Sequence, residues 1–352
     1  VYFFVLKNIP FCDYKKLYLN HRENYLKIID EVASNGGFIM QQAKKDFEKE
    51  LSEFTGCNHA IGVGNCTDGL EIIWQSIGLR PGDEIICSSH TFIATASSIV
   101  MAGGVPKPVD IGDDNLICTE AISDAINPRT VGIMPTQLNG RTCDMGKIMN
   151  IANKYKLYVV EDAAQAIGSE YKGIKIGSFG KAGCFSLHPL KNLSALGDGG
   201  FISTNDDSLA SWLKRARNHG HSSRDECDFW SFNMRLDTIQ AAFILEKFPF
   251  LEEQTERRRS NAKFYRENIS SSNIVLPLEE EHERCVNHLF VIRTKNRDKL
   301  QSFLNSKGIE TKIHYPIPIH KLKAANMLNF NLPKTIEFSK TILSLPIYPE
   351  LK

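Results

Sequence analysis

A strong excess of charge of either sign is absent from this sequence of 352 residues. Its 42 lysines and arginines are balanced by 41 aspartates and glutamates, which leaves a net charge of +1. Proteins that bind a nucleic-acid backbone usually carry a basic surface. The basic run at residues 257–259 follows several glutamates and predicts one charged helix face rather than a polybasic tail. We therefore expect no nucleic-acid partner.

Long hydrophobic runs are also missing, and none approaches the length of a membrane span. The opening residues 1–6 are apolar, but they are too few for the core of a signal peptide and no basic residues precede them. With 42% hydrophobic and 24% charged residues, the composition is that of a globular protein with a large core, which we expect in two domains. No membrane partner is expected.

Closely paired cysteines are a third absence. The nine cysteines are scattered, none forms a Cys-x-x-Cys motif, and their number is odd. Metal sites and disulfide frameworks both need regular spacing of their cysteines. The pattern therefore indicates reduced thiols, no bound metal and a cytoplasmic location.

What the sequence does contain, over its first two-thirds, is an alternation of short apolar runs with amphipathic segments. This alternation predicts an α/β fold with a mostly parallel sheet and helices on both faces. Ligands bind such sheets at the carboxyl ends of the strands. The expected strands are 59–63, 84–87, 105–109, 131–134, 157–160, 183–186 and 200–203, and the expected helices are 68–78, 91–102, 119–126, 144–155 and 207–217.

The last third has a different pattern. A helical pattern over residues 237–245 resumes across 252–268, and a strand-like run (287–293), a helix (297–307) and an extended stretch (311–318) follow. We expect a large domain over residues 1–245, including the N-terminal segment, and a smaller α+β domain over residues 246–352.

The segment from Gly62 to Leu70 follows an expected strand and opens an expected helix. Backbone N–H groups and the positive end of the helix dipole suit a phosphate there, and the Thr67 hydroxyl can add a hydrogen bond. A helix cap without a ligand is the alternative. A nicotinamide site is disfavoured, because Thr67 replaces the third glycine of that motif and Asp83 precedes the next strand instead of following it.

Two further residues suit the ends of one flat cofactor. Asp162 ends an apolar run, and Lys191 lies 29 residues later, five residues after Ser186. Lysine can form a Schiff base with an aldehyde, and a buried aspartate can pair with a protonated ring nitrogen. Phe92, after another strand, could stack on the ring. Taken singly, these residues could be a surface lysine, a helix cap and a core side chain. Their order predicts a fold-type-I enzyme that uses pyridoxal 5'-phosphate.

Ten ordered blocks, spread over essentially the whole chain, resemble the DegT/DnrJ/EryC1/StrS family of sugar aminotransferases. The blocks are residues 64–70, 81–86, 91–96, 161–166, 177–180, 185–200, 217–220, 233–237, 313–316 and 345–349.

This resemblance implies a pyridoxal-phosphate enzyme in which Lys191 forms the Schiff base and then moves protons, while Asp162 pairs with the ring nitrogen. It also implies that Gln165 and Phe92 flank the ring, and that Thr67, the Asp68 backbone and Ser186 hold the phosphate. Asn233 would reach the phosphate from the neighbouring subunit, which implies a homodimer. The residues implied to contact the sugar or nucleotide are His188, Arg235, His314, Tyr315 and His320. A packed loop histidine is an equally good interpretation of His188.

The sequence departs from the family pattern in two places. Cys66 and Gly69 stand where the family usually has glycine and alanine. The frequent Pro-Val-His-Leu-Tyr-Gly block is Pro-Thr-Gln-Leu-Asn-Gly at residues 135–140, which removes a histidine and an aromatic residue from the expected cleft.

The family's reaction implies an amino-acid donor, usually glutamate, and a keto sugar linked to a nucleotide as acceptor. Such products serve amino-sugar and surface polysaccharide synthesis, including lipopolysaccharide. Family members acting at C3 tend to carry Lys-Asn-Leu and Gly-Asp-Gly-Gly, as at residues 191–193 and 197–200 here, which favours a 3-keto sugar. A 4-keto acceptor and a non-catalytic regulatory member of the fold are the alternatives. A lysine at position 191, instead of histidine, disfavours the dehydratase branch.

Overall fold

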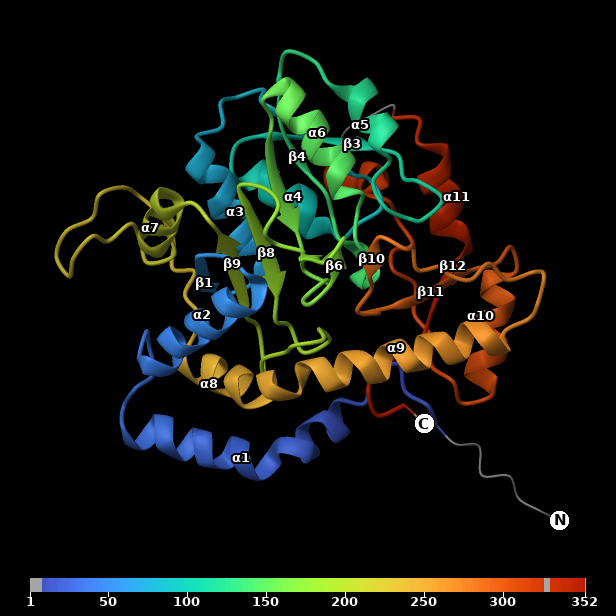
Figure 1. The fold of residues 1–352 in the computed structure, drawn as a ribbon, viewed down its shortest axis with the longest axis horizontal. Coiled ribbons are helices and arrows are strands. Elements are labelled where there is room, and N and C mark those ends of the chain that lie inside the picture. Colours follow the sequence, from blue (N-terminus) through green and yellow to red (C-terminus); the bar gives the residue numbers. More distant parts are fainter. Residues whose placement is uncertain (1–7, 326–329, 352) are drawn as a thin grey trace.

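The computed structural model describes residues 8–325 and 330–351 (Figure 1). The expectation about residues 1–6 lies outside these ranges. No helix in the described ranges is both long enough and apolar enough to cross a membrane.

A seven-stranded sheet forms the centre of the molecule, with strand order β1-β9-β8-β5-β4-β2-β3. The pairs β2–β3, β2–β4, β4–β5 and β5–β8 are parallel, which confirms the expected mostly parallel α/β fold. Strand β9 is the exception: it runs antiparallel to both β1 and β8. The strands are β1 (His59–Val63), β2 (Glu84–Ser88), β3 (Val105–Val109), β4 (Thr130–Met134), β5 (Tyr158–Asp162), β8 (Ala182–Ser186) and β9 (Gly200–Thr204).

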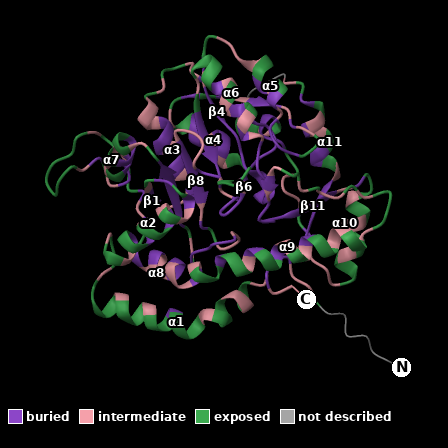
Figure 2. Ribbon diagram, in the orientation of Figure 1, coloured by how far each residue is buried: buried purple, intermediate pink, exposed green. Residues whose placement is uncertain are grey.

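Helices cover both faces of this sheet, so successive residues of a strand enter two different cores. In β8, Cys184 packs in one core and Phe185 in the other, and β9 divides Ile202 and Phe201 in the same way. This alternation is why the strands are apolar throughout and appear buried in Figure 2. The helices are α1 (Tyr14–Ser34), α2 (Gln42–Thr55), α3 (Cys66–Ile77), α4 (Ile93–Met101), α5 (Thr119–Ala125), α6 (Met145–Tyr155), α7 (Asp207–Ala216) and α8 (Thr238–Lys247).

Beyond α8, the long helix α9 (Leu251–Asn268) extends above α1 in the view of Figure 1, toward a second group of elements. Ala262 of α9 is buried in a separate small core with residues of β11 (Phe290–Arg293) and β12 (Ile342–Leu345). The same group contains α10 (Arg297–Ser306) and α11 (Pro333–Thr341). The expected domain division at residues 245 and 246 falls near the end of α8 and stays a prediction.

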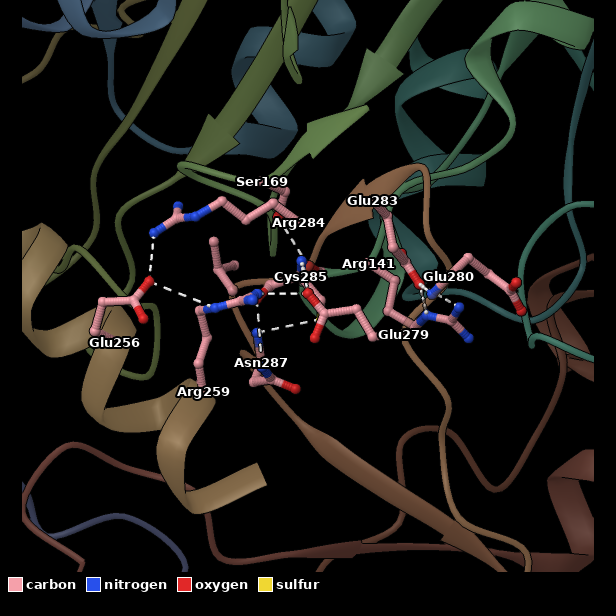
Figure 3. A network of polar contacts seen from close by, with 12 residues as sticks. Arg141, Ser169, Glu256, Arg259, Glu279, Glu280, Glu283, Arg284, Cys285 and Asn287 are labelled. Carbon is pink, nitrogen blue, oxygen red and sulfur yellow. Dashed lines mark hydrogen bonds and ion pairs between the residues drawn. The ribbon is translucent and has the colours of Figure 1, made fainter. Parts of the chain in front are cut away.

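A small sheet joins the two parts of the chain. It contains β10 (Glu283–Arg284), β6 (Glu170–Tyr171) and β7 (Ile174–Lys175), in that order. Beside it, the guanidinium of Arg141 donates to the carboxylate of Glu283, and both side chains are buried (Figure 3). Breaking one partner of a buried ion pair usually costs about 3–5 kcal/mol, so this pair holds the segment after β4 against β10.

Candidate active site

The predicted cofactor residues gather at the carboxyl edge of the sheet. Strand β1 leads into α3, β5 ends at Asp162 and β8 ends at Ser186. The side chains of Lys191, Asp162 and Cys66 are close enough to shift one another's pKa values. The fold therefore brings together residues that are more than 100 positions apart in the sequence.

Asp162 is buried, with 3% of its surface exposed, and its carboxylate is held by hydrogen bonds. The Thr95 hydroxyl donates to Oδ2 at 2.6 Å, and the Ala164 backbone N–H donates to Oδ1 at 3.2 Å. Burial nevertheless raises the pKa of Asp162. Within residues 8–325 and 330–351 no Lys, Arg or His nitrogen lies within 4.0 Å of this carboxylate. A protonated ring nitrogen would supply the missing cation.

The hydroxyl that holds Asp162 belongs to a small network that the sequence analysis did not identify. Thr95 Oγ1 lies 2.9 Å from Thr91 Oγ1, which donates to Thr136 Oγ1 at 3.1 Å. All three threonines are buried. Only the contact between Thr95 and Asp162 reveals this role, because a threonine in the first turn of a helix is otherwise an ordinary residue.

Lys191 lies in the loop between β8 and β9, where its backbone N–H donates to the carbonyl of His188 at 2.8 Å. Burial lowers the pKa of its amine, and the neighbouring Cys66 and Asp162 partly offset that shift. A lower pKa makes the neutral amine easier to form, and the neutral amine is the nucleophile.

The first turn of α3 is suited to hold an anion. The Asn65 side chain caps the helix by accepting from the backbone N–H of Asp68 at 2.9 Å. The first intrahelical bond runs from Gly69 N–H to Asn65 O. The N–H groups of Cys66 and Thr67 therefore point beyond the helix end. This differs from the expectation for Asp68, whose N–H is engaged by Asn65 here. Half-buried Ser186 ends the adjacent part of the sheet at β8.

Contacts link Gln165, Tyr315 and Phe92, and Tyr315 lies near Asp162. Gln165 Oε1 accepts from the backbone N–H of Asn139 at 2.6 Å, and its Nε2 donates to the Tyr315 hydroxyl at 3.1 Å. The Tyr315 and Phe92 rings lie 5.6 Å apart, and Phe92 is 52% exposed. An exposed aromatic ring at the start of α4 is available to stack on a flat ligand.

The other predicted substrate residues fall in different places. His188 is exposed overall. Partial desolvation of its ring and the positive charge of Lys191 both lower its pKa. His314 Nδ1 lies 2.9 Å from Ser344 Oγ, and burial lowers the pKa of His314 to about 4. His320 is 4% exposed and its Nδ1 lies 2.6 Å from Ser89 Oγ, so its ring is packed within the protein.

Asn233 and Arg235 follow α7 on an extended segment whose backbone contacts Asn218 and Val63. Arg235 Nη1 donates to Asn218 Oδ1 at 3.0 Å, while Asn233 is exposed. Asn233 is therefore free to meet a second molecule, as its expected role requires.

Residues 135–140, where the sequence departs from the family pattern, place their polar side chains inside the protein. Gln137 is fully buried: its Nε2 donates to Glu161 Oε2 at 3.0 Å, and its Oε1 accepts from Cys143 N–H at 2.7 Å. Asn139 is 5% exposed and supports Gln165 through its backbone. Gln137 thus belongs to the core, and the block shapes the cleft through the backbone of Asn139.

Comparison with known proteins agrees with this geometry. Residues 20–352 match the model of the DegT/DnrJ/EryC1/StrS aminotransferase family. The chain is 38% identical to a "pleiotropic regulatory protein" of Geobacillus stearothermophilus, with 98% of this chain and 95% of the relative covered. It is 37% identical to a UDP-N-acetyl-3-dehydro-alpha-D-glucosamine 3-aminotransferase of Acidithiobacillus ferrooxidans, with 98% and 94% covered.

Among solved structures, Streptomyces venezuelae DesV in complex with a ketimine intermediate has a TM-score of 0.95 and 35% identity, with 98% of this chain and 94% of DesV covered. The half-buried lysine, the aspartate without a cationic partner among the described residues, and the helix N-terminus fit pyridoxal phosphate. The chain belongs to the DegT/DnrJ/EryC1/StrS aminotransferase family and is a transaminase that depends on pyridoxal phosphate.

Proposed function

We propose that this transaminase moves an amino group from L-glutamate to the keto group of a nucleotide-linked sugar, with a 3-keto sugar as the favoured acceptor. The observation that carries the proposal is half-buried Lys191 beside the buried carboxylate of Asp162, where the charge of each residue shifts the pKa of the other. The products would enter amino-sugar and surface polysaccharide synthesis. The named activity of the Acidithiobacillus relative supports both the nucleotide sugar and its 3-keto group.

Each residue has a distinct part in this reaction. Bound pyridoxal phosphate supplies an aldehyde for the amino group and a ring that accepts electrons. Asp162 would hold the proton on the ring nitrogen, because Thr95 and Ala164 fix its carboxylate. Lys191 Nζ would take and return protons, which its lowered pKa favours. Phe92 and Gln165 would flank the ring, and Thr67 and Ser186 would surround its phosphate. Asp68 would follow Thr67 in the same turn, with its N–H held by Asn65.

The favoured C3 position rests partly on Asn192, which follows the lysine in the sequence. Asn192 is 7% exposed, its Nδ2 donates to Val286 O at 3.0 Å, and its Oδ1 lies 3.3 Å from His288 Nδ1. Asn192 therefore anchors the lysine loop instead of facing the cleft. We infer that this residue influences the acceptor through the position of the loop.

We also propose that two chains form the working enzyme. The exposed Asn233 would approach the phosphate in the neighbouring chain. Each chain would have a large domain over residues 1–245 and a small domain over residues 246–352. His188, Arg235, His314 and Tyr315 would surround the sugar or nucleotide. The packing of His320 against Ser89 supports a role for that residue behind the cleft instead.

The test is turnover with a panel of 3-keto and 4-keto sugars linked to dTDP, UDP and GDP, with glutamate as donor. We expect visible cofactor absorbance, amination of a 3-keto sugar, and loss of both in Lys191→Ala. Turnover of 4-keto sugars alone would overturn the C3 assignment, and protein loaded with cofactor but lacking the absorbance band would overturn the role of Lys191.

A regulatory protein that binds the cofactor without turnover is the second candidate, and the name of the Geobacillus relative favours it. The two candidates differ in one half-reaction. An enzyme converted by glutamate to its amine form returns to the aldehyde form when a keto sugar is added. A regulator would stay in the amine form with every sugar of the panel.

A further inference from the structure

Cys184 lies on β8 beside Asp162 and has no part in the catalytic assignments above. In the parallel pairing of β5 and β8, Cys184 is the Cα partner of Asp162. Residues paired in this way project to the same face of a sheet. The Cys184 thiol is fully buried, and its Sγ donates to the backbone carbonyl of Cys66 at 3.3 Å. Cys66 is the first residue of α3, whose N-terminal turn suits the phosphate.

Gly69, one turn into α3, leaves the space that this sulfur fills. A Cβ atom at position 69 would lie 2.4 Å from Cys184 Sγ, and 3.2 Å from both Ile202 Cγ1 and Val63 Cγ2. The first distance is far inside van der Waals contact, whereas the other two require only a small adjustment. The methyl group of an alanine and the sulfur thus compete for one volume. This gives a physical reason for glycine at position 69.

We propose that Cys184 is a positioning residue for the cofactor, which ties the strand beside Asp162 to the first turn of α3. One thiol thereby sets the separation between the group that holds the ring nitrogen and the groups that hold the phosphate. The proposal rests on the cofactor and on the phosphate role of α3, and it is independent of the sugar. A side-chain hydrogen bond with Cys184 and burial raise the pKa of the Cys66 thiol, so Cys66 packs as a neutral group.

The first test is the affinity of the whole protein for pyridoxal phosphate, measured by fluorescence quenching after removal and return of the cofactor. Cys184→Ala should bind it about tenfold more weakly, the effect expected from one hydrogen bond. Cys57→Ala is the matched control, because Cys57 is also buried and donates to a backbone carbonyl, Gly177 O, at 3.5 Å. The control should lose stability by a similar amount yet keep its cofactor affinity within about twofold.

The second test uses Gly69→Ala in two backgrounds, with thermal unfolding of the cofactor-free protein as the readout. In the presence of Cys184, the added methyl clashes with the sulfur, and the melting temperature should fall. In Cys184→Ala the sulfur is gone, so the better helix propensity of alanine should dominate and the melting temperature should rise. The effect of one substitution should therefore reverse sign.

Two results would overturn the proposal. Equal cofactor affinity in Cys184→Ala and Cys57→Ala would show that the Cys184 thiol contributes packing alone. The same effect of Gly69→Ala in both backgrounds would show that the sulfur and the methyl do not compete. Neither measurement involves a sugar, so failure of the proposed acceptor would leave both results unaffected.

Discussion

At the scale of single residues, the two acids that end β5 have opposite surroundings. Asp162 faces the cleft, where Thr95 and a bound ring can compensate its charge. Glu161 is fully buried on the other side of the strand, with Gln137 Nε2 at 3.0 Å and the Phe179 N–H at 2.9 Å. Burial raises the pKa of Glu161 to about 7, although these hydrogen bonds oppose the shift. Of these two adjacent acids, Asp162 thus serves cofactor binding and Glu161 serves the structure of the core.

The raised pKa of Glu161 predicts how stability depends on pH. Its folded pKa of about 7 lies above the usual 4.5, so the stabilisation it provides is complete below about pH 4.5 and is lost as pH rises through 7. Glu161→Gln removes this titration. Compared with the variant, the free energy of unfolding of the native protein should fall by on the order of 3 kcal/mol between pH 4.5 and 8.

Urea denaturation at a series of pH values measures this difference. Glu50→Gln, which changes an exposed acid on α2, is the control and should keep the slope of the native protein. Parallel profiles for the native protein and Glu161→Gln would contradict the assignment.

At the scale of elements, the loop between β8 and β9 must be held still for Lys191 to act. Asn192 ties this loop to Val286 and His288, which precede β11. Asn192→Ala removes one hydrogen bond from each partner and frees the loop. We expect kcat for sugar amination to fall about tenfold, because small misplacements of a reacting group are costly.

The matched control for this prediction is Asn268→Ala. Its carboxamide also donates to a backbone carbonyl, that of Phe264, but on the exposed side of α9. Unchanged kcat in Asn192→Ala, with the same cofactor absorbance, would show that the loop is held by other contacts.

Sequence patterns predicted the elements of the central sheet because each strand is a short apolar run between polar or glycine-rich turns. All seven strands lie where the runs predicted them. The direction of β9 was not predicted, since an apolar run carries no information about which neighbour it pairs with. The short strands β6, β7 and β10, with two residues each, are too brief to show a period.

The residues of the site also differ in how far the sequence alone reveals their roles. Lys191 and Asp162 stand out in the sequence because charged residues are unusual beside apolar strands. The contributions of Thr95 and Cys184 depend on contacts between separate elements, at 2.6 Å to Asp162 and 3.3 Å to Cys66. The position of Gln137 in a motif did not reveal its partners, and only its contacts with Glu161 and Cys143 place it in the core.

At the scale of the whole molecule, the proposed homodimer makes a quantitative prediction. Asn233 is exposed on its own chain and is expected to complete the phosphate site of the partner. Asn233→Asp would bring a negative charge toward that phosphate, and Lys191→Ala removes the reactive amine from its own chain. In a mixed dimer of these two variants, one site carries both changes and the other carries neither.

Each variant alone should therefore be nearly inactive, while a refolded one-to-one mixture should recover about a quarter of native activity, since about half of the dimers are mixed and half of their sites are intact. The measurement is sugar amination after co-refolding, with mixed dimers verified by two different affinity tags. A mixture of Lys191→Ala with Asp162→Asn is the control, because both of these changes lie in the site of their own chain. If Asn233 instead served its own chain, each subunit of a mixed dimer would keep one defect, and the first mixture would stay as inactive as its components.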